Sequence, residues 1–567
     1  MNSQQRKMQQ RQAEARRIAV GVLAFLIFLQ AAAFTIVCRE KDGFHEDEGF
    51  TLSINGDEAW AEFSNYTNRW VDPLYFDTYF AVPEEGRFHY DGVLAEALLD
   101  PTNPPLYYFA FHTVYSFFPG LVSAWPGILL NLLFFVLAQV CLWNLGLLLF
   151  RHPMLALLPP VFFGFSLGAL NAVSFLRMYM LAMLIAAAFL LLAFRLLRLG
   201  FRVRETVLLA AVGFLGAMTH YYLIFYLILV TAAYFTSMIL RCARSVNRLH
   251  WGCWLPSIIS AAAFVAAIVG AFFAHPVIWA HITSTADGLK TAAASRAGGS
   301  GGQFAAFMQA VASDELNISA GLPKIIVLLG LLVFAIALLV GMRTERGKKY
   351  QSRLPKIALR EPVLLTLLAT TAVYFAVVFR TAPYQVDRFL MPCFPAIALL
   401  LSFAMAFFAQ KLRIDARAVP TAIALLLAVF SLGGYTDAMH YLYPQKGAGE
   451  ALRLGTASEP VVVLAYTGAG RECLSLFPEL YLRKQGSPLY IADYPELEQN
   501  PEELAWVFES AREQGGGDSG RVTVFVASMH QGQFQPEAAA EAARSAGGFG
   551  TSKYLYSIPN YDVYELS

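Results

Sequence analysis

Residues 18–50, IAVGVLAFLIFLQAAAFTIVCREKDGFHEDEGF, decide the fold of this chain. The first part, Ile18–Cys38, is 21 residues long and carries no charge. A helix needs about 20 apolar residues to cross the hydrocarbon of a bilayer. A basic tail (residues 1–17) precedes this run, and the acidic segment His45-Glu46-Asp47-Glu48 follows it. The stretch therefore predicts a membrane-spanning helix that opens into a polar loop.

A cleaved signal peptide is the alternative interpretation of this run, because Ala31–Ala33 resembles a cleavage site. The apolar core of a signal peptide is only about 7–15 residues long. Since Ile18–Cys38 is longer than that, we predict that it is retained as the first span.

The composition of the whole chain predicts a membrane protein. Of the 567 residues, 57% are hydrophobic and 15% are charged, whereas an ordinary soluble domain has about 25% charged residues. The net charge of +1 argues against a nucleic-acid partner, and the six cysteines show neither metal-ligand spacing nor a disulfide framework. These features exclude a soluble enzyme and favour a polytopic helical bundle.

Further apolar runs continue along the chain to residue 435. They are Pro104–Phe118, Trp125–Phe150, Met154–Phe175, Met178–Leu197, Thr206–His220, Tyr221–Leu240, Leu255–Trp279, Lys324–Met342, Pro362–Phe379, Phe389–Ala409 and Val419–Tyr435. Three segments before Leu240 are short or interrupted, so we predict 11 to 13 crossings.

The distribution of Lys and Arg predicts the orientation of these spans, because cytoplasmic loops are rich in both residues. The basic loops are Arg195–Arg204, Arg241–Arg248, Arg343–Arg360 and Lys411–Arg417, and we place them with the N-terminus in the cytoplasm. The first loop, 39–103, holds fifteen Asp and Glu against four Lys and Arg. We place this loop, the glycine-rich loop 280–322 and the C-terminus outside, which requires an odd number of crossings.

The composition divides the chain into a tail (1–17), a transmembrane domain (18–435) and a small α/β domain (436–567). In the last part, β-branched runs predict strands and Pro-initiated amphipathic runs predict helices. The expected strands are Pro460–Tyr466, Pro488–Ala492, Arg521–Ala527 and a hairpin of Lys553–Ile558 with Tyr561–Leu566, and the expected helices are Pro501–Gln514 and Pro536–Ala546.

Several short motifs near the predicted outer surface carry groups suited to chemistry. Asp47 and Glu48 are candidates for a general base or a metal site, although a solvated acidic loop is the simpler interpretation. Arg388 follows Tyr384 at an outer helix start, and a guanidinium there suits phosphate binding. Arg177 and His220 lie among apolar residues, where a snorkelling arginine and a hydrogen-bonded structural histidine are the alternatives.

The order of these motifs resembles the GT-C superfamily of polytopic glycosyltransferases, particularly the bacterial branch related to protein O-mannosyltransferases and the lipid A aminoarabinose transferase. The resemblance covers about residues 18–435. Its motifs are Asp47-Glu48, Pro104-Pro105-Leu106-Tyr107-Tyr108, Arg177-Met178-Tyr179, Thr219-His220-Tyr221, and Arg388 before a proline-containing span. Asn103 stands where the family usually has histidine.

The resemblance implies transfer of a sugar from a polyprenyl-phosphate donor to a glycan, lipid or protein acceptor at the outer face. Asp47 matches the expected catalytic base, and Glu48 matches its neighbour. For the donor phosphate we expect Arg388, Arg177, His220 and Tyr384, and for other substrate contacts Asn103, Tyr107, Tyr108, Tyr179 and Tyr221.

The expected chemistry is a direct displacement. A carboxylate that removes the acceptor proton on the face opposite the phosphate predicts inversion, and cations stabilise the departing phosphate. The sequence requires no cofactor, although the acidic pair is compatible with a divalent cation. The expected enzyme is a hexosyl- or pentosyl-transferase.

Two other classes of protein remain as alternatives. A transporter or flippase of a lipid-linked sugar would place ionisable groups within its spans and build its site from broken helices. The predicted spans are nearly free of Asp and Glu, which favours surface chemistry. A receptor or scaffold that only presents the C-terminal domain would not need this many spans. We therefore expect a glycosyltransferase in a bacterial plasma membrane.

Overall fold

The structure is a computed structural model that describes residues 3–41, 44–55, 68–71, 80–99, 104–150, 152–243, 251–274, 362–382, 387–412, 418–424, 459–465, 487–514, 520–527, 535–558 and 561–567. The chain forms two compact units. The bundle unit comprises Met1–Arg39, Asp100–Tyr107 and Ile128–His440. The loop–sheet unit comprises Glu40–Leu99, Tyr108–Gly127 and Tyr441–Ser567.

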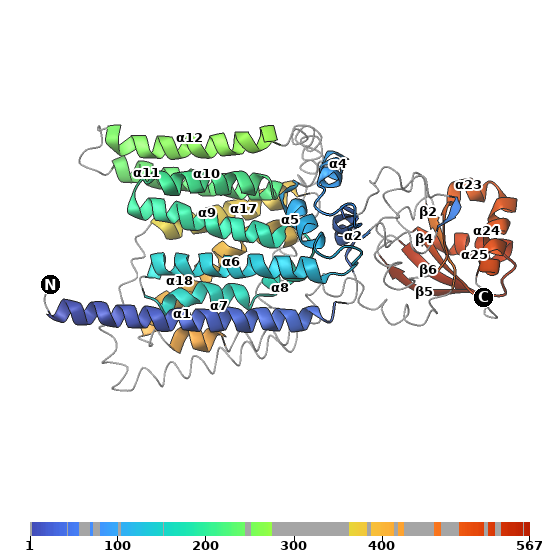
Figure 1. The fold of residues 1–567 in the computed structure, drawn as a ribbon, viewed down its shortest axis with the longest axis horizontal. Coiled ribbons are helices and arrows are strands. Elements are labelled where there is room, and N and C mark those ends of the chain that lie inside the picture. The colour runs from blue at the N-terminus through green and yellow to red at the C-terminus, as the bar shows by residue number, and fades with distance from the viewer. Residues whose placement is uncertain are drawn as a thin grey trace. The chain divides into compact units, whose positions relative to one another are not determined.

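The bundle unit consists of helices that run alongside one another (Figure 1). They are α1 (Ser3–Cys38), α6 (Trp125–Phe150), η2 (Leu155–Leu157), α7 (Leu158–Gly164), α8 (Leu167–Ser174), α9 (Tyr179–Leu199), α10 (Val203–Ala217), α11 (Tyr221–Ala243), α12 (Trp251–Ala274), α17 (Pro362–Thr381), η4 (Asp387–Cys393) and α18 (Phe394–Leu412). The predicted polytopic helical bundle is therefore confirmed.

Among the described residues, six helices are long and apolar enough to cross a membrane. A seventh crossing is formed if Leu155–Gly164 and Leu167–Ser174, which bend by 55° at their junction, count as one span. The structure also shows why the predicted count was ambiguous. The helix within Pro104–Phe118 is the ten-residue α5 (Leu106–Tyr115), and α10 has only 15 residues. The predicted span Lys324–Met342, the loop 280–322 and most of Val419–Tyr435 lie outside the described residues.

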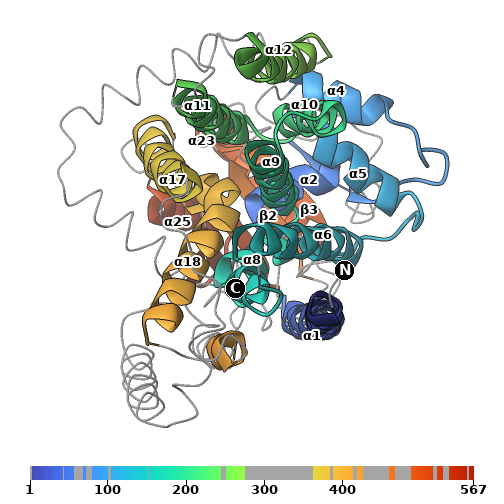
Figure 2. The same cartoon turned by 90° about the vertical axis from the view of Figure 1, so that its left-hand side faces the viewer.

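Helix α9 is the central helix of the bundle, as the end-on view in Figure 2 shows. In its most apolar window 78% of the residues are buried, against 22% for α1. Small residues such as Ala182, Ala186 and Ala187 are fully buried along α9, and small residues let helix backbones approach closely in membranes. Helices α10, α11 and α18 and the turn η4 pack around it.

A buried polar contact joins three helices of the bundle. Gln139 Nε2 of α6 donates to Gln30 Oε1 of α1 at 2.7 Å, and Gln30 Nε2 donates to the carbonyl oxygen of Pro160 in α7 at 3.2 Å. Gly164 makes room for this contact, because a Cβ atom there would collide with both amide groups. The contact therefore requires glycine at position 164.

The loop–sheet unit contains α2 (Glu46–Ser53), α4 (Asp91–Leu99), most of α5 and a six-stranded sheet (Figure 1). The strands are β1 (Arg69–Val71), β2 (Val461–Ala465), β3 (Leu489–Asp493), β4 (Val522–Ala527), β5 (Ser552–Ile558) and β6 (Tyr561–Leu566), in the order β1-β3-β2-β4-β6-β5. Strands β3, β2 and β4 are parallel and the others pair antiparallel. Helices α23 (Tyr494–Glu498), α24 (Pro501–Gln514) and α25 (Pro536–Ala546) complete the unit.

The sequence explains most of this α/β arrangement. Strands β2 and β4 are buried at every position, as expected for parallel strands covered on both faces. Helix α24 buries Leu504, Val507, Phe508 and Ala511, a helical spacing that presents one apolar face to the sheet. The predicted α/β character, both Pro-initiated helices and the closing hairpin are confirmed. The predicted strands begin one residue early at β2, β3 and β4.

Strand β1 comes from the first loop, far from the rest of the sheet in sequence. It pairs antiparallel with β3, with Trp70 opposite Tyr490. Asn68, which precedes β1, accepts a hydrogen bond from the Asp493 backbone at 3.0 Å and donates to Glu496 Oε2 at 3.1 Å. The loop that carries Asp47 is therefore part of the same unit as the C-terminal sheet.

Candidate functional site

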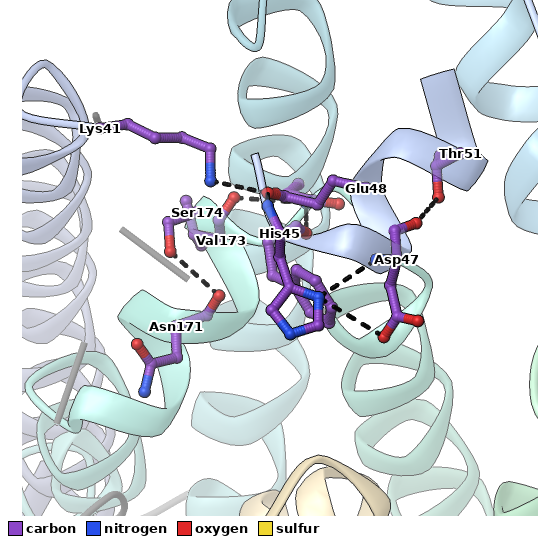
Figure 3. Close-up of polar contacts among 10 residues, drawn as sticks. Lys41, His45, Asp47, Glu48, Thr51, Asn171, Val173 and Ser174 are labelled. Atoms are coloured by element: carbon purple, nitrogen blue, oxygen red, sulfur yellow. Dashed lines mark hydrogen bonds and ion pairs between the residues drawn. The ribbon is translucent and has the colours of Figure 1, made fainter. Parts of the chain in front are cut away.

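The acidic segment after the first span forms the start of helix α2 (Figure 3). His45 is the N-cap in extended conformation, and its Nδ1 accepts a hydrogen bond from the Asp47 backbone N–H at 3.1 Å. Glu48 Oε2 accepts a hydrogen bond from the His45 backbone N–H at 2.7 Å. These reciprocal bonds form a capping box, which satisfies backbone donors that a helix start otherwise leaves exposed.

The two neighbouring carboxylates of this turn have different surroundings. The Glu48 side chain is fully buried, and its Oε2 also contacts Lys41 Nζ at 3.0 Å. The Asp47 side chain is 21% exposed, and its Oδ2 lies 3.8 Å from His45 Nδ1. A group that removes a proton from a bound substrate must be within hydrogen-bond reach of it. Of the pair, Asp47 is the one that solvent reaches.

In the bundle unit, Arg177 lies in the short connection between α8 and α9. Its backbone N–H donates to the carbonyl oxygen of Phe175 at 2.7 Å. Asn131 of α6 also donates to the Phe175 carbonyl oxygen, at 2.8 Å, and the Phe175 ring stacks on Tyr179. These contacts fix the backbone on both sides of Arg177, whose side chain is buried with 6% of its surface exposed.

His220 lies in the connection between α10 and α11 and is also buried. Its ring contacts Tyr179, Tyr222 and Phe389, with ring centroids 5.3, 5.9 and 6.3 Å away. Burial, followed by the positive charges of Arg177 and Arg388, lowers the pKa of His220 to about 3. The imidazole is therefore neutral at pH 7, and its Nδ1 makes no hydrogen bond to the residues that the structure describes.

Arg388 is held by the turn η4, which leads directly into α18. Tyr374 of α17 fixes this turn by donating from its hydroxyl to the Phe389 carbonyl oxygen at 2.7 Å. The Arg388 guanidinium carbon lies 5.7 Å from the centre of the Phe389 ring, and the same ring contacts His220. The structure therefore brings Arg177, His220 and Arg388, predicted from separate motifs, into one cationic cluster lined by aromatic rings.

The other predicted site residues occupy varied positions. Tyr179 lines the cationic cluster, and Tyr221 begins α11 beside His220. Tyr107 is fully buried and donates to Asn131 Oδ1 at 3.3 Å, so it supports the connection that carries Arg177. Tyr108 is also buried. Asn103 and Tyr384 lie outside the described residues.

The sequence did not single out Lys41, His45, Tyr222 or Phe389 as site residues. Lys41 had a usable signal, since it is a rare cation in a strongly acidic loop. His45 precedes Glu48 with capping-box spacing, but histidine is not among the preferred N-cap residues. No group of three or more His, Cys, Asp or Glu in the described part of the chain is arranged to hold a metal ion.

Comparison with known proteins gives similarity at the level of structure. No family model and no curated protein matches the chain. The chain is similar to ArnT from Cupriavidus metallidurans bound to undecaprenyl phosphate, with a TM-score of 0.47, 13% identity and coverage of 96% of this chain and 98% of that chain. The apo state of ArnT gives a TM-score of 0.46 at 13% identity, covering 97% and 98%.

An oligosaccharyltransferase from Archaeoglobus fulgidus, solved with zinc and sulfate, gives a TM-score of 0.34 at 12% identity, covering 95% of this chain and 72% of that chain.

Proposed function

We propose that this chain is an integral-membrane glycosyltransferase that moves a sugar from a polyprenyl-phosphate donor to an acceptor hydroxyl with inversion. The anomeric carbon loses its bond to the phosphate oxygen and gains a bond to the acceptor oxygen. The acceptor proton passes to a carboxylate, and polyprenyl phosphate leaves. The protein would act at the outer face of a bacterial plasma membrane, with its N-terminus in the cytoplasm and its C-terminal domain outside.

The observation that carries this proposal is the cationic cluster. The Arg388 guanidinium lies against the Phe389 ring, and the same ring contacts the buried His220. The buried Arg177 lies two residues before Tyr179, whose ring also contacts His220. A positive charge in a water-poor site is suited to an anion that is attached to an apolar chain. A guanidinium pairs bidentately with phosphate oxygens. A polyprenyl phosphate combines both properties. We assign Arg388 and Arg177 to the donor phosphate, with Tyr384 nearby in sequence.

The base in this proposal is Asp47. Its carboxylate is partly exposed, whereas the adjacent Glu48 is buried and occupied by Lys41. Proton removal by a positioned carboxylate contributes about 10²–10⁴-fold to a rate. The remaining predicted residues, Tyr179 and Tyr221 in particular, would contact the lipid-linked sugar. The acceptor is a glycan, a lipid or a protein. The acidic pair is compatible with a divalent cation.

The test uses the full-length protein in nanodiscs with a panel of hexosyl, pentosyl and amino-sugar polyprenyl phosphates. We expect release of polyprenyl phosphate from one donor by the wild type, and at least about 10²-fold slower release by Asp47→Asn. Addition of EDTA in the same assay decides whether a divalent cation takes part.

The control is Glu84→Gln, which neutralises an exposed carboxylate of the same unit that pairs with Arg87 at the surface. It should leave the rate unchanged. If Asp47→Asn retains most of the activity, Asp47 is not the base. If no donor is turned over but labelled donor crosses a liposome bilayer in a protein-dependent way, the chain is a flippase and the proposal is wrong.

A further inference from the structure

Helix α2 is very short for an element that carries a proposed catalytic group. It has eight residues, Glu46–Ser53, and isolated helices of this length are unstable in water. The position of the Asp47 carboxylate therefore depends on what holds this helix. An error of about 1 Å in the position of a catalytic group costs about 10²-fold in rate.

The backbone of Asp47 is bound on both sides. Its N–H donates to His45 Nδ1, and its carbonyl oxygen accepts from Thr51 Oγ1 at 3.1 Å. Figure 3 shows these contacts, with the Asp47 carboxylate on the His45 side of the helix. The peptide groups of Asp47 are therefore fixed while part of its carboxylate faces solvent.

Glu48 connects this helix start to the chain before it. One oxygen, Oε2, accepts hydrogen bonds from the backbone N–H of His45 and from Lys41 Nζ. The Lys41 side chain is only 5% exposed and that of Glu48 is not exposed at all. A buried carboxylate that already accepts two donors is constrained in position, and it is poorly placed to receive a proton from a substrate.

We propose that Lys41, His45 and Glu48 form a positioning unit that holds the Asp47 carboxylate in its reactive place, and that Glu48 takes no part in the chemistry. This inference rests on the proposed function for the role of Asp47. It assigns the two neighbouring acids to different tasks, although the sequence motif presents them as a catalytic pair. Glu48 and Lys41 act through the backbone of α2, and His45 acts by capping it.

The decisive comparison is between Glu48→Gln and Glu48→Ala. A glutamine side chain can accept the same hydrogen bonds and is a normal partner in a capping box, but it can neither remove a proton nor serve as an anionic metal ligand. We expect Glu48→Gln to keep kcat within about 5-fold of wild type. We expect Glu48→Ala to lower kcat by about 10²-fold with little change in KM for the donor.

Lys41→Met should resemble Glu48→Ala, and Lys41→Arg should recover most of the lost activity. Glu84→Gln again serves as the control carboxylate. If Glu48→Gln loses as much activity as Asp47→Asn, Glu48 is part of the chemistry and the proposal is overturned.

A second measurement does not depend on activity. Hydrogen exchange of the amides at residues 47–50 should speed up in Glu48→Ala and Lys41→Met and remain near the wild-type rate in Glu48→Gln. If Glu48→Ala leaves this exchange unchanged, Glu48 does not position the helix. If the exchange responds as expected but the wild type transfers no sugar, the positioning unit stands and the proposed function fails.

Discussion

The indole N–H of Trp70 donates a 2.8 Å hydrogen bond to Ser510 Oγ, across 440 positions of the sequence. Trp70 belongs to the three-residue strand β1 of the acidic first loop, and Ser510 belongs to helix α24 beside the C-terminal sheet. The Trp70 ring also meets Tyr490 edge to face at 5.3 Å. The loop after the first span and the C-terminal domain are therefore stabilised by the same core.

We predict that Trp70→Phe destabilises the sheet around β3 by about 1 kcal/mol, because it removes the hydrogen-bond donor and keeps an aromatic ring. Trp70→Ala should cost more, since it also removes the ring contact with Tyr490. Hydrogen exchange at residues 489–493 in the full-length protein measures the effect. Trp506→Phe is the control, because Trp506 is half exposed and also lies near Tyr490. Equal exchange in all three variants would contradict the prediction.

The elements of the C-terminal sheet were predictable because each carries its own local signal. Pro501 and Pro536 begin amphipathic helices, and Val461–Ala465 is a run of residues suited to a buried parallel strand. Strand β1 was not predictable, since Arg69–Val71 is too short for any periodicity and its partner lies about 420 residues away. Such a pairing depends on tertiary contacts that a local pattern does not contain.

The candidate site was predictable in its residue types and less so in its arrangement. Arg177, His220 and Arg388 stood out because charged and polar groups are costly among apolar residues. The sequence could not predict that these residues lie together, because their proximity depends on the ring of Phe389 and on the turn that Tyr374 holds. The unequal burial of Asp47 and Glu48 was equally hidden, because two adjacent acids look alike in a sequence.

The buried amide contact between Gln30 and Gln139 gives a second prediction. Gln139→Leu should destabilise the bundle by about 0.6–2 kcal/mol, the usual range for hydrogen bonds between membrane helices. The double variant Gln30→Leu/Gln139→Leu should recover part of this loss, because neither amide is then left without its partner. Thermal unfolding in nanodiscs measures both.

Gly164→Ala tests the same contact from the third helix. Its Cβ atom would collide with the two amides, so it should destabilise the bundle as Gln139→Leu does. Gly21→Ala on α1 is the matched control, since nothing lies within 4 Å of a Cβ atom there. If Gly164→Ala and Gly21→Ala unfold at the same temperature, the close approach at Gly164 does not contribute to stability.

The neutral state of His220 predicts a dependence of stability on pH. Its folded pKa of about 3 lies below the ordinary histidine pKa of 6.5, so the unfolded chain binds more protons between these pH values. The contribution of His220 to stability is fully present above pH 6.5 and is lost as the pH falls toward 3. At pH 5 the loss is about 2 kcal/mol.

The measurement compares the unfolding of wild type and His220→Gln at pH 7.5 and pH 5.0. The wild type should lose more stability on acidification than the variant does. His112→Gln is the comparison, because burial also lowers the pKa of His112, which belongs to the loop–sheet unit. An equal loss in wild type and His220→Gln would show that His220 is protonated in the folded protein.

The cationic cluster gives the last prediction, on binding of the lipid product. Arg388→Ala and Arg177→Ala should each weaken binding of undecaprenyl phosphate by about 10- to 150-fold, the value of one charge-assisted hydrogen-bonded contact of about 1.5–3 kcal/mol. Arg388→Lys should fall between Arg388→Ala and wild type, because an ammonium keeps the charge and loses the bidentate geometry. Titration of the nanodisc-bound protein with undecaprenyl phosphate measures the affinities.

Arg380→Ala, at an exposed position in the last turn of α17, controls for the loss of one positive charge and should bind like wild type. If Arg388→Ala and Arg380→Ala bind with the same affinity, the cluster does not hold the phosphate, and the anion it was proposed to receive must bind elsewhere on the chain.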